Sequence, residues 1–352
     1  MAGADILGIG MMTAVGVGAA QTATSVRAGV ARLAESAIHN RQFNPIVMGT
    51  LPEEELPPLE ESLDKLPGLT SRQMRMLRLA GPALHEAVAD VGSVADVPLL
   101  LAVPEALPDR IDPAGPKFLE HLVKQSRVAF QLAGSKMFPH GRAGGFLALA
   151  EGLDLIESGR AARVLVGGVE SYLDLYLLAT LDAEGRVLAE GVMDGFAPGE
   201  GAAFLLLGPP RGPGGRPIAH IVAAATGIEA GHRYSEEPYR GDGLAETFQA
   251  LFAADGACDE PVKTVLAGLN GENFGAKEWG TAYLRSKEQF VDDMQLQHPV
   301  DCFGDAGAAL GPLLVTLGAI GIQKGYMSEP CLAWASSDRE ERGAALLRGR
   351  SS

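Results

Sequence analysis

Short apolar runs alternate with segments of helical periodicity along the first part of the chain. Each run has the length of a strand and is followed by apolar residues at the three- and four-residue spacing of a helix. The predicted strand and helix pairs are Ile6–Gly10 with Gln21–Ala34, Ile46–Met48 with Ser71–Val91, and Val97–Val103 with Lys117–Leu132. Strands that alternate with helices in this way predict βαβ units and a largely parallel sheet.

A second series of elements follows a cluster of prolines and glycines at Gly208–Pro217, which can continue neither a helix nor a central strand. We interpret this cluster as the boundary between an N-terminal half, residues 1–210, and a C-terminal half, residues 211–352. The elements expected beyond it are a strand at Val262–Leu269, a helix at Gly275–Phe290, an apolar helix at Ala306–Ile322 and a strand at Cys331–Ala335.

Two apolar segments predicted as helices, one in each half, share residue types at a constant separation of 166 positions. The matching pairs are Gly145 and Gly311, Gly152 and Gly318, Ile156 and Ile322, and Gly159 and Gly325. Each copy is a buried helix followed by a short strand, so the pattern indicates an internal duplication. Coincidence is the alternative, because three of the four matches are glycines in a chain that contains 45 of them.

No segment is predicted to cross a membrane. The run Ala306–Ile322 has Thr316 as its one non-apolar residue, and its length is at the lower limit of about 17 residues for a span. Pro312 and the small residues around it favour a helix packed between two sheets instead. The apolar run Ile6–Ala20 follows Asp5 without an upstream lysine or arginine, unlike a secretory signal peptide. We therefore expect a cytoplasmic protein.

Composition and charge narrow the classes of partner. Hydrophobic residues make up 47% of the 352 residues, which is ample for a buried core. A formal charge of −15 argues against nucleic acid and anionic membranes, which need clustered cations, and weakly against acidic carrier proteins. Arg72, Arg75 and Arg78 share one predicted helix, where they form either a local basic patch or, as we favour, a solvated face.

The sequence carries no recognisable motif for a cofactor or a metal. The three cysteines, Cys258, Cys302 and Cys331, have no paired spacing, so neither a disulfide framework nor a zinc site is expected. Gly8 and Gly10 lack the third glycine of a dinucleotide-binding turn. We therefore expect no cofactor and no bound metal.

Several glycine-rich segments resemble those of the β-ketoacyl synthases of the thiolase-like superfamily. These segments are Gly141–Gly145 before an apolar helix, Val164–Ser171, and Asp194–Ala203, which is the most specific of the three. The resemblance covers most of the chain, from Gly8 to the last strands. It implies an α/β protein with the duplicated five-layer αβαβα thiolase-like fold.

Active members of that family acylate a cysteine at the start of the first buried helix and use two histidines beside it. A helix N-terminus lowers the pKa of a thiol, which makes the nucleophilic thiolate available. The resemblance places Arg142 at the cysteine position, and Asn270 and Asp301 at the histidine positions. A guanidinium has no acceptor and stays protonated, so Arg142 cannot attack an acyl group. The loop expected to line the acyl pocket, Ala335–Gly343, is polar and charged, and we expect no catalytic residue at the three vestigial positions.

Arg142, Asn270 and Asp301 would still share one cavity in such a fold. An ion pair of Arg142 with Asp301 would satisfy both charges and fill the old pocket, and we favour this over a ligand-binding role. The other residues expected around the pocket are His140, Glu272, Cys302 and Phe303. Cys302 is interpreted as a packed core cysteine whose pKa the charge of Asp301 raises. His140 would act as a general base only beside a nucleophile, and the sequence shows none.

Loss of all three reactive groups, beside retention of the glycines of the fold, favours a non-catalytic protein that binds other proteins as a subunit or adaptor. Two contexts of the resembling family fit: a chain-length-factor-like partner of an active ketosynthase, and a ketosynthase-like protein near bacterial type VI secretion effectors. The second is preferred because the chain is short and Met12–Gly16 resembles that group. The alternative is an enzyme of altered chemistry that processes acyl thioesters with Asp301, Asn270 or Glu272.

The resemblance also implies how the chain associates. Proteins of this fold join their sheets across a two-fold axis through the strand before the cysteine position, here about Ser135–Phe138. We therefore expect a homodimer with a further protein partner, either a secretion effector or an active ketosynthase. Acyl carrier protein or acyl-CoA is an open alternative that we do not favour.

Overall fold

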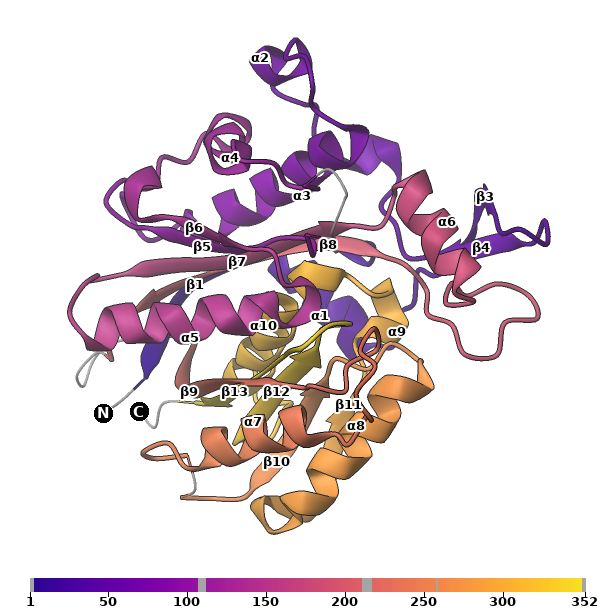
Figure 1. The fold of residues 1–352 in the computed structure, drawn as a ribbon. Helices are drawn as coiled ribbons and strands as arrows, with labels where there is room; N and C mark the ends of the chain where they lie inside the picture. Colours follow the sequence, from indigo (N-terminus) through magenta and orange to yellow (C-terminus); the bar gives the residue numbers. More distant parts are fainter. Residues whose placement is uncertain (1–2, 107–111, 211–216, 258, 350–352) are drawn as a thin grey trace.

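The computed structural model describes residues 3–106, 112–210, 217–257 and 259–349. Helices lie above, between and below two layers of strands (Figure 1), which is the αβαβα order expected from the sequence. The helices are α3 (Ser71–Val88) and α4 (Phe118–Ser126) above, α5 (Gly144–Glu157) and α10 (Leu310–Gln323) between, and α7 (Asp242–Phe252) and α8 (Asn273–Arg285) below.

Strand order shows that the fold is a duplication. The upper layer runs β6-β5-β7-β8-β1, the lower layer runs β11-β10-β12-β13-β9, and β1 pairs with β9 so that the two layers join. In each layer the first three strands are parallel and the next two pairings are antiparallel. The upper strands are β1 (Ala4–Thr13), β5 (Leu99–Ala102), β6 (Lys136–Phe138), β7 (Val164–Ser171) and β8 (Glu200–Gly208). The lower strands are β9 (Ala219–Ile228), β10 (Val262–Ala267), β11 (Phe290–Gln297), β12 (Cys331–Ser336) and β13 (Glu341–Arg348).

The two central helices, α5 and α10, begin and end at equivalent positions of the repeat. α5 and α10 each have 14 residues and begin 166 positions apart. A 3₁₀ turn of three residues precedes each helix, at Gly141–Ala143 and at Gly307–Ala309. Just past the helix ends, Gly159 and Gly325 adopt φ of 70° and 71°, the left-handed conformation that commonly terminates helices. The residue matches seen in the sequence are therefore structural equivalences.

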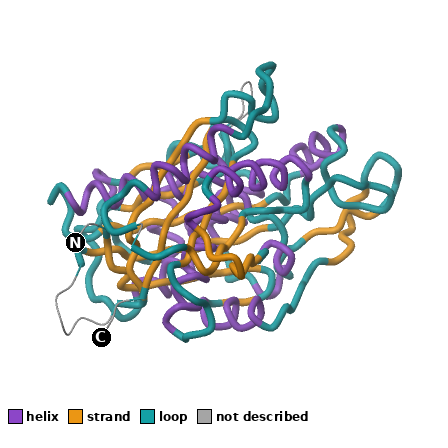
Figure 2. The backbone as a smooth tube through the Cα atoms, turned by 90° about the horizontal axis from the view of Figure 1, so that it is seen from below, coloured by secondary structure: helices purple, strands orange, loops and turns teal. Residues whose placement is uncertain are grey.

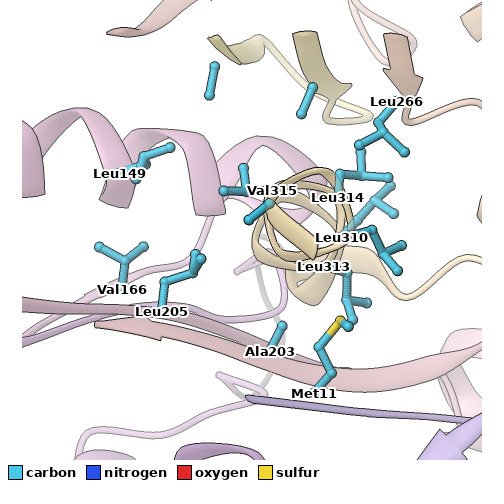
Figure 3. Packing of buried hydrophobic residues seen from close by; sticks show 14 of the residues in the cluster. Met11, Leu149, Val166, Ala203, Leu205, Leu266, Leu310, Leu313, Leu314 and Val315 are labelled. Atoms are coloured by element: carbon cyan, nitrogen blue, oxygen red, sulfur yellow. The ribbon is translucent and has the colours of Figure 1, made fainter. Parts of the chain in front are cut away.

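The main core surrounds α10. Figure 3 shows this helix end-on, with Leu313 toward Met11 and Ala203 of the upper layer and Leu314 on the side of Leu266 of the lower layer. These five side chains are at most 1% exposed. A helix that contacts a sheet on both sides is apolar all round, which explains why this segment resembles a membrane span in sequence.

Two of the predicted helices end earlier than the sequence pattern suggested. α1 (Ala19–Arg27) stops where Gly29 adopts φ of 66° and takes the chain out of the helix. α4 ends at Ser126 because Arg127 takes the left-handed conformation, with φ of 57°. In both cases a single backbone conformation that periodicity does not reveal sets the boundary.

Two strands also differ from the prediction. β4 (Pro45–Met48), which was expected in the main sheet, pairs with β3 (Ala34–His39) in a separate two-stranded sheet. The apolar side chains of β4 pack with α6 (Leu175–Ala183) in a small satellite core. β11 (Phe290–Gln297) was not predicted: the helix expected at Gly275–Phe290 reaches only its first residue, whereas α8 ends at Arg285.

The expected boundary between the halves, Gly208–Pro217, includes residues 211–216, which lie outside the described part of the chain, and the division at residue 210 stays a prediction. The start of β1 and the end of β13 lie on the same side of the molecule (Figures 1 and 2), where both strands pair with the first residues of β9. Within the described ranges, no helix combines the length and hydropathy that a membrane span needs. The cytoplasmic location stays a prediction.

Candidate functional site

The candidate site lies at the N-terminus of α5, where the sequence resemblance places a nucleophile. β6 ends at Phe138, and the 3₁₀ turn Gly141–Ala143 leads into the helix. Gly141 adopts φ of 58°, a conformation that costs a glycine little. Arg142, in the middle of the turn, has a side chain that is 6% exposed. A buried cation beside the positive end of a helix dipole needs carboxylates to compensate it.

Asp305 and Asp338 supply these carboxylates. Nε and Nη2 of Arg142 both lie 2.6 Å from Oδ2 of Asp305, and its Nη1 donates to Oδ1 of Asp338 at 2.9 Å. Burial opposes a charged guanidinium, but the two carboxylates outweigh it and raise the pKa of Arg142 well above its ordinary value. Arg142 is therefore a fixed cation without a lone pair to offer.

Asp305 also accepts hydrogen bonds from groups other than Arg142. It lies before the 3₁₀ turn of α10 and accepts hydrogen bonds from the amide of Asn270 and the backbone N–H of Gly307, both at 2.9 Å. The sequence resemblance assigned this position to Asp301, which is exposed on the short helix α9 (Val300–Phe303). Arg142 does pair with an aspartate, but the partner is Asp305 and not the predicted Asp301, which belongs to α9 and is exposed.

Arg186 completes the ion network around Asp338. Its Nε and Nη2 donate to the two carboxylate oxygens of Glu272 at 2.8 Å, and its Nη1 and Nη2 donate to Asp338 at 2.9 Å. Arg233 lies 2.9 Å from Glu272, and the amide of Asn270 donates to Glu272 at 3.0 Å. Although burial alone would raise it, the surrounding guanidiniums hold the pKa of Asp338 well below its usual range. Asp338 is therefore ionised at neutral pH.

The β12–β13 loop covers the start of α5. The backbone N–H of Ala143 donates to Oγ of Ser337 at 3.0 Å, and the Ser337 hydroxyl donates to the carbonyl of His140. Nδ1 of His140 lies 2.6 Å from a carboxylate oxygen of Glu341, and this hydrogen bond raises the pKa of the histidine. The backbone N–H of Ala143 is therefore bonded to Ser337 and is not free to bind an anion. His140 holds the loop through its hydrogen bond with Glu341.

Cys302 and Phe303 belong to the core and do not line the site. They are 7% and 0% exposed within the main apolar cluster. Burial, together with the charge of Asp301, raises the pKa of the Cys302 thiol. Burial raises the pKa of Cys331 to about 12. Both of these cysteines are therefore held as thiols, while Cys258 lies outside the described residues.

The three arginines of α3 form neither a basic patch nor a solvated face. The pairs are Arg72 with Glu170 at 2.7 Å, Arg75 with Glu200 at 2.6 Å and Arg78 with Glu53. Glu170 and Glu200 are buried. The helix thus neutralises carboxylates of the upper layer instead of presenting positive charge.

A cavity of about 340 Å³ opens beside Arg142. Its walls include Gly141, Tyr172, Leu177, Leu181, Tyr234 and Asp338. The groups that reach it are carboxylates, guanidiniums, phenols, one threonine hydroxyl and apolar side chains. Such side chains can bind and orient a ligand. Most of the charged ones take part in ion pairs.

The sequence had pointed to only part of this network. Arg142, Asn270 and Glu272 were named and do lie together, whereas Asp305, Asp338, Arg186 and Arg233 were missed. The available signal was the charged loop Ala335–Gly343, which was noted as unsuited to an acyl pocket. Asp338 of this loop balances the charge of Arg142.

The chain matches no family model, and it matches no curated protein sequence. It is similar in structure to many solved chains. One belongs to a type II polyketide synthase acyl-carrier protein in complex with its ketosynthase, with a TM-score of 0.76 at 15% identity over 99% of this chain and 100% of that chain. The ishigamide ketosynthase/chain length factor has a TM-score of 0.70 at 17% identity, again over 99% and 100%.

Ketosynthase domains of larger synthases are similar as well. The ketosynthase from module 6 of the bacillaene synthase of Bacillus subtilis 168 has a TM-score of 0.76 at 12% identity, over 99% of this chain and 72% of that chain. The sequence identities to these proteins are low, and the property that the proteins share with this chain is the fold. The chain has the thiolase-like fold of the ketosynthases, as the sequence resemblance implied.

Proposed function

We propose that this chain is a non-catalytic, ketosynthase-like subunit that pairs with an active ketosynthase in the manner of a chain length factor. The carrying observation is the buried Arg142, which stands at the start of α5 and is held by Asp305 and Asp338 at 2.6 and 2.9 Å. An acyl-transfer enzyme needs an activated nucleophile there. A neutralised ion network stabilises the fold at this position and supplies no nucleophile.

The dimensions of the chain support the same role. It covers the full length of the matched chains in the structures titled as an acyl-carrier protein–ketosynthase complex and as a ketosynthase/chain length factor. By contrast, it covers only 72–76% of the length of each of five matched chains that are ketosynthase domains of larger synthases. A single unit of the ketosynthase fold that works beside a second chain of the same fold fits these proportions.

The pairing surface we propose is the open edge of β6. The backbone N–H of Val103 donates to the carbonyl of Phe138, so the backbone groups of Phe138 face β5. Neighbouring residues of a strand present their N–H and C=O groups to opposite sides, and those of Met137 therefore face the open edge. A second strand could pair with Met137 there, whether it comes from a copy of this chain, as the sequence suggested, or from an active ketosynthase.

The test is purification of the tagged full-length chain from its host, with mass determination by light scattering and identification of bound chains. We expect a complex with a ketosynthase-fold chain that retains its catalytic cysteine. Met137→Pro removes the outward N–H and should abolish the complex, whereas Met137→Ala loses the same side chain, keeps the N–H and should retain it. A mass of 36.7 kDa for the unaltered chain, or pairing that survives the proline, would refute the proposal.

The secretion-effector adaptor preferred from the sequence rested on Met12–Gly16. These residues form the end of β1 and the tight turn into β2 (Gly16–Val17), where they have a local structural role. None of the comparisons favours that context. Altered acyl-thioester chemistry also lacks support, because Asn270 and Glu272 are engaged with the ion network and Asp301 is exposed away from it.

A further inference from the structure

The cavity beside Arg142 carries more carboxylates than guanidiniums. Among the residues that the structure describes, its four carboxylates are Glu105, Glu170, Glu184 and Asp338, and its three guanidiniums are Arg72, Arg142 and Arg339. Each guanidinium pairs with one carboxylate of the walls, and Arg142 also pairs with Asp305 behind them. Glu184 accepts a hydrogen bond from the Tyr234 hydroxyl at 2.9 Å and lies 3.6 Å from Arg186. Behind this wall, Arg186 and Arg233 are matched in number by Asp305 and Glu272. The surplus charge of the walls is therefore negative.

Glu105 is the least compensated of these carboxylates. Its Oε1 is buried and lies 2.9 Å from Nε of Arg339, yet neither atom takes part in a well-directed hydrogen bond. Burial, reinforced by the charges of Asp338 and Glu341, raises the pKa of Glu105 to about 7 against the opposing effect of Arg339 and Arg142. A further positive group at this carboxylate would offset the free-energy cost of burying its charge.

The remaining walls suit an apolar or aromatic group. Leu177 and Leu181 of α6 and the ring of Tyr172 line the same cavity, and Tyr172 is 8% exposed. Aromatic faces attract cations, and apolar side chains gain from covering an apolar tail. At the mouth, Tyr234 and the side chain of Arg339 are 43% and 34% exposed, so the cavity is reached from the surface.

We propose that this cavity binds a small organic cation, a protonated amine with a short apolar or aromatic tail, whose ammonium group lies at Glu105 and whose tail lies against α6. This ligand site goes beyond the subunit role and does not depend on it, because the pairing edge at β6 and the cavity are tested separately. A carboxylate or an extended acyl chain would meet the surplus negative charge or leave Glu105 unpaired.

The experiment is isothermal titration calorimetry of the full-length chain with phenethylamine as probe. The matched ligands are 2-phenylethanol, which lacks the charge, and 3-phenylpropionate, which reverses it. We expect the amine to bind at least about tenfold more tightly than the alcohol at pH 8, and the acid not to bind. Because the amine favours the ionised carboxylate, its affinity should rise between about pH 6 and 8 with release of a proton.

Two variants test whether amine binding depends on Glu105 itself or only on the overall negative charge of the protein. Glu105→Gln keeps the shape of the side chain and should remove both the preference for the amine and its pH dependence. Glu120→Gln changes an exposed carboxylate of α4 and should leave both intact. Equal binding of amine and alcohol to the unaltered chain, absence of amine binding, or an amine preference that survives Glu105→Gln would each overturn the proposal.

Discussion

Gly145 of α5 and Pro312 of α10 approach so closely that a Cβ on the glycine would lie 2.3 Å from Cδ of the proline. Gly311, the repeat equivalent of Gly145, is part of the same contact, since its own Cβ would lie 3.3 Å from the Cα of Gly145. The two central helices cross here, at their N-terminal ends. The crossing therefore sets the separation of the 3₁₀ turns that carry Arg142 and follow Asp305.

Gly145→Ala should destabilise the protein by about 2–3 kcal/mol, because the added methyl group has no space and the helices must separate. The matched control is Gly280→Ala in α8, where a Cβ meets nothing within 4 Å and removal of a helical glycine should be neutral or stabilising by up to about 1 kcal/mol. Urea unfolding monitored by circular dichroism measures both. Equal stability of the two variants would show that the crossing is not tightly packed.

The Arg142–Asp305 pair should show strong energetic coupling. Arg142→Met leaves a buried carboxylate without its cation, and Asp305→Asn weakens the compensation of a buried guanidinium, so each should cost about 3 kcal/mol. In the double variant neither charge is stranded, and we expect it to be more stable than the sum of the single changes by at least about 1 kcal/mol. A double-mutant cycle of unfolding free energies checks this, and strict additivity would contradict the described geometry.

The raised pKa of Glu105, about 7, has a defined consequence for the pH dependence of stability. An unfolded glutamate titrates near about 4.3, so between that pH and about 7 the folded state binds more protons than the unfolded state. Stability from this group therefore falls as pH rises through this window, by at most about 4 kcal/mol, and levels off above it. Glu105→Gln should remove the fall, so that the variant is more stable than the unaltered chain at pH 8 but not at pH 4. Parallel stability profiles from pH 4 to 8 would count against the buried, poorly compensated carboxylate.

Local signals in the sequence predicted the alternating strands and helices and the internal repeat, and the resemblance to the β-ketoacyl synthases implied the five-layer fold. Apolar runs reveal buried strands, and helices sandwiched between sheets keep small residues such as Gly145 and Gly311 where they touch. The polar edge strand β11 and the separate β3–β4 hairpin were missed, because what distinguishes them is their place at the periphery and not their residue pattern.

Some members of the ion network could be named from the sequence, but the carboxylates that pair with Arg142 could not. Arg142 and Asn270 stand at recognisable positions relative to glycines, so they could be named. Asp305 and Asp338 are brought to Arg142 by long-range packing. The predicted ion partner, Asp301, stands four residues before Asp305, because the residue spacing does not show that Asp301 belongs to the short helix α9.

The most direct test of the central claim is acyl transfer itself. The full-length chain is incubated with acyl and malonyl thioesters of coenzyme A and of a carrier protein, thiol release is followed, and the intact mass is measured. We predict thiol release at the background rate and no covalent acyl adduct, both for the unaltered chain and for Asn270→Ala. Thiol release above background, or an acyl adduct, that disappears in Asn270→Ala would show that the site at Arg142 is catalytic and would contradict the account.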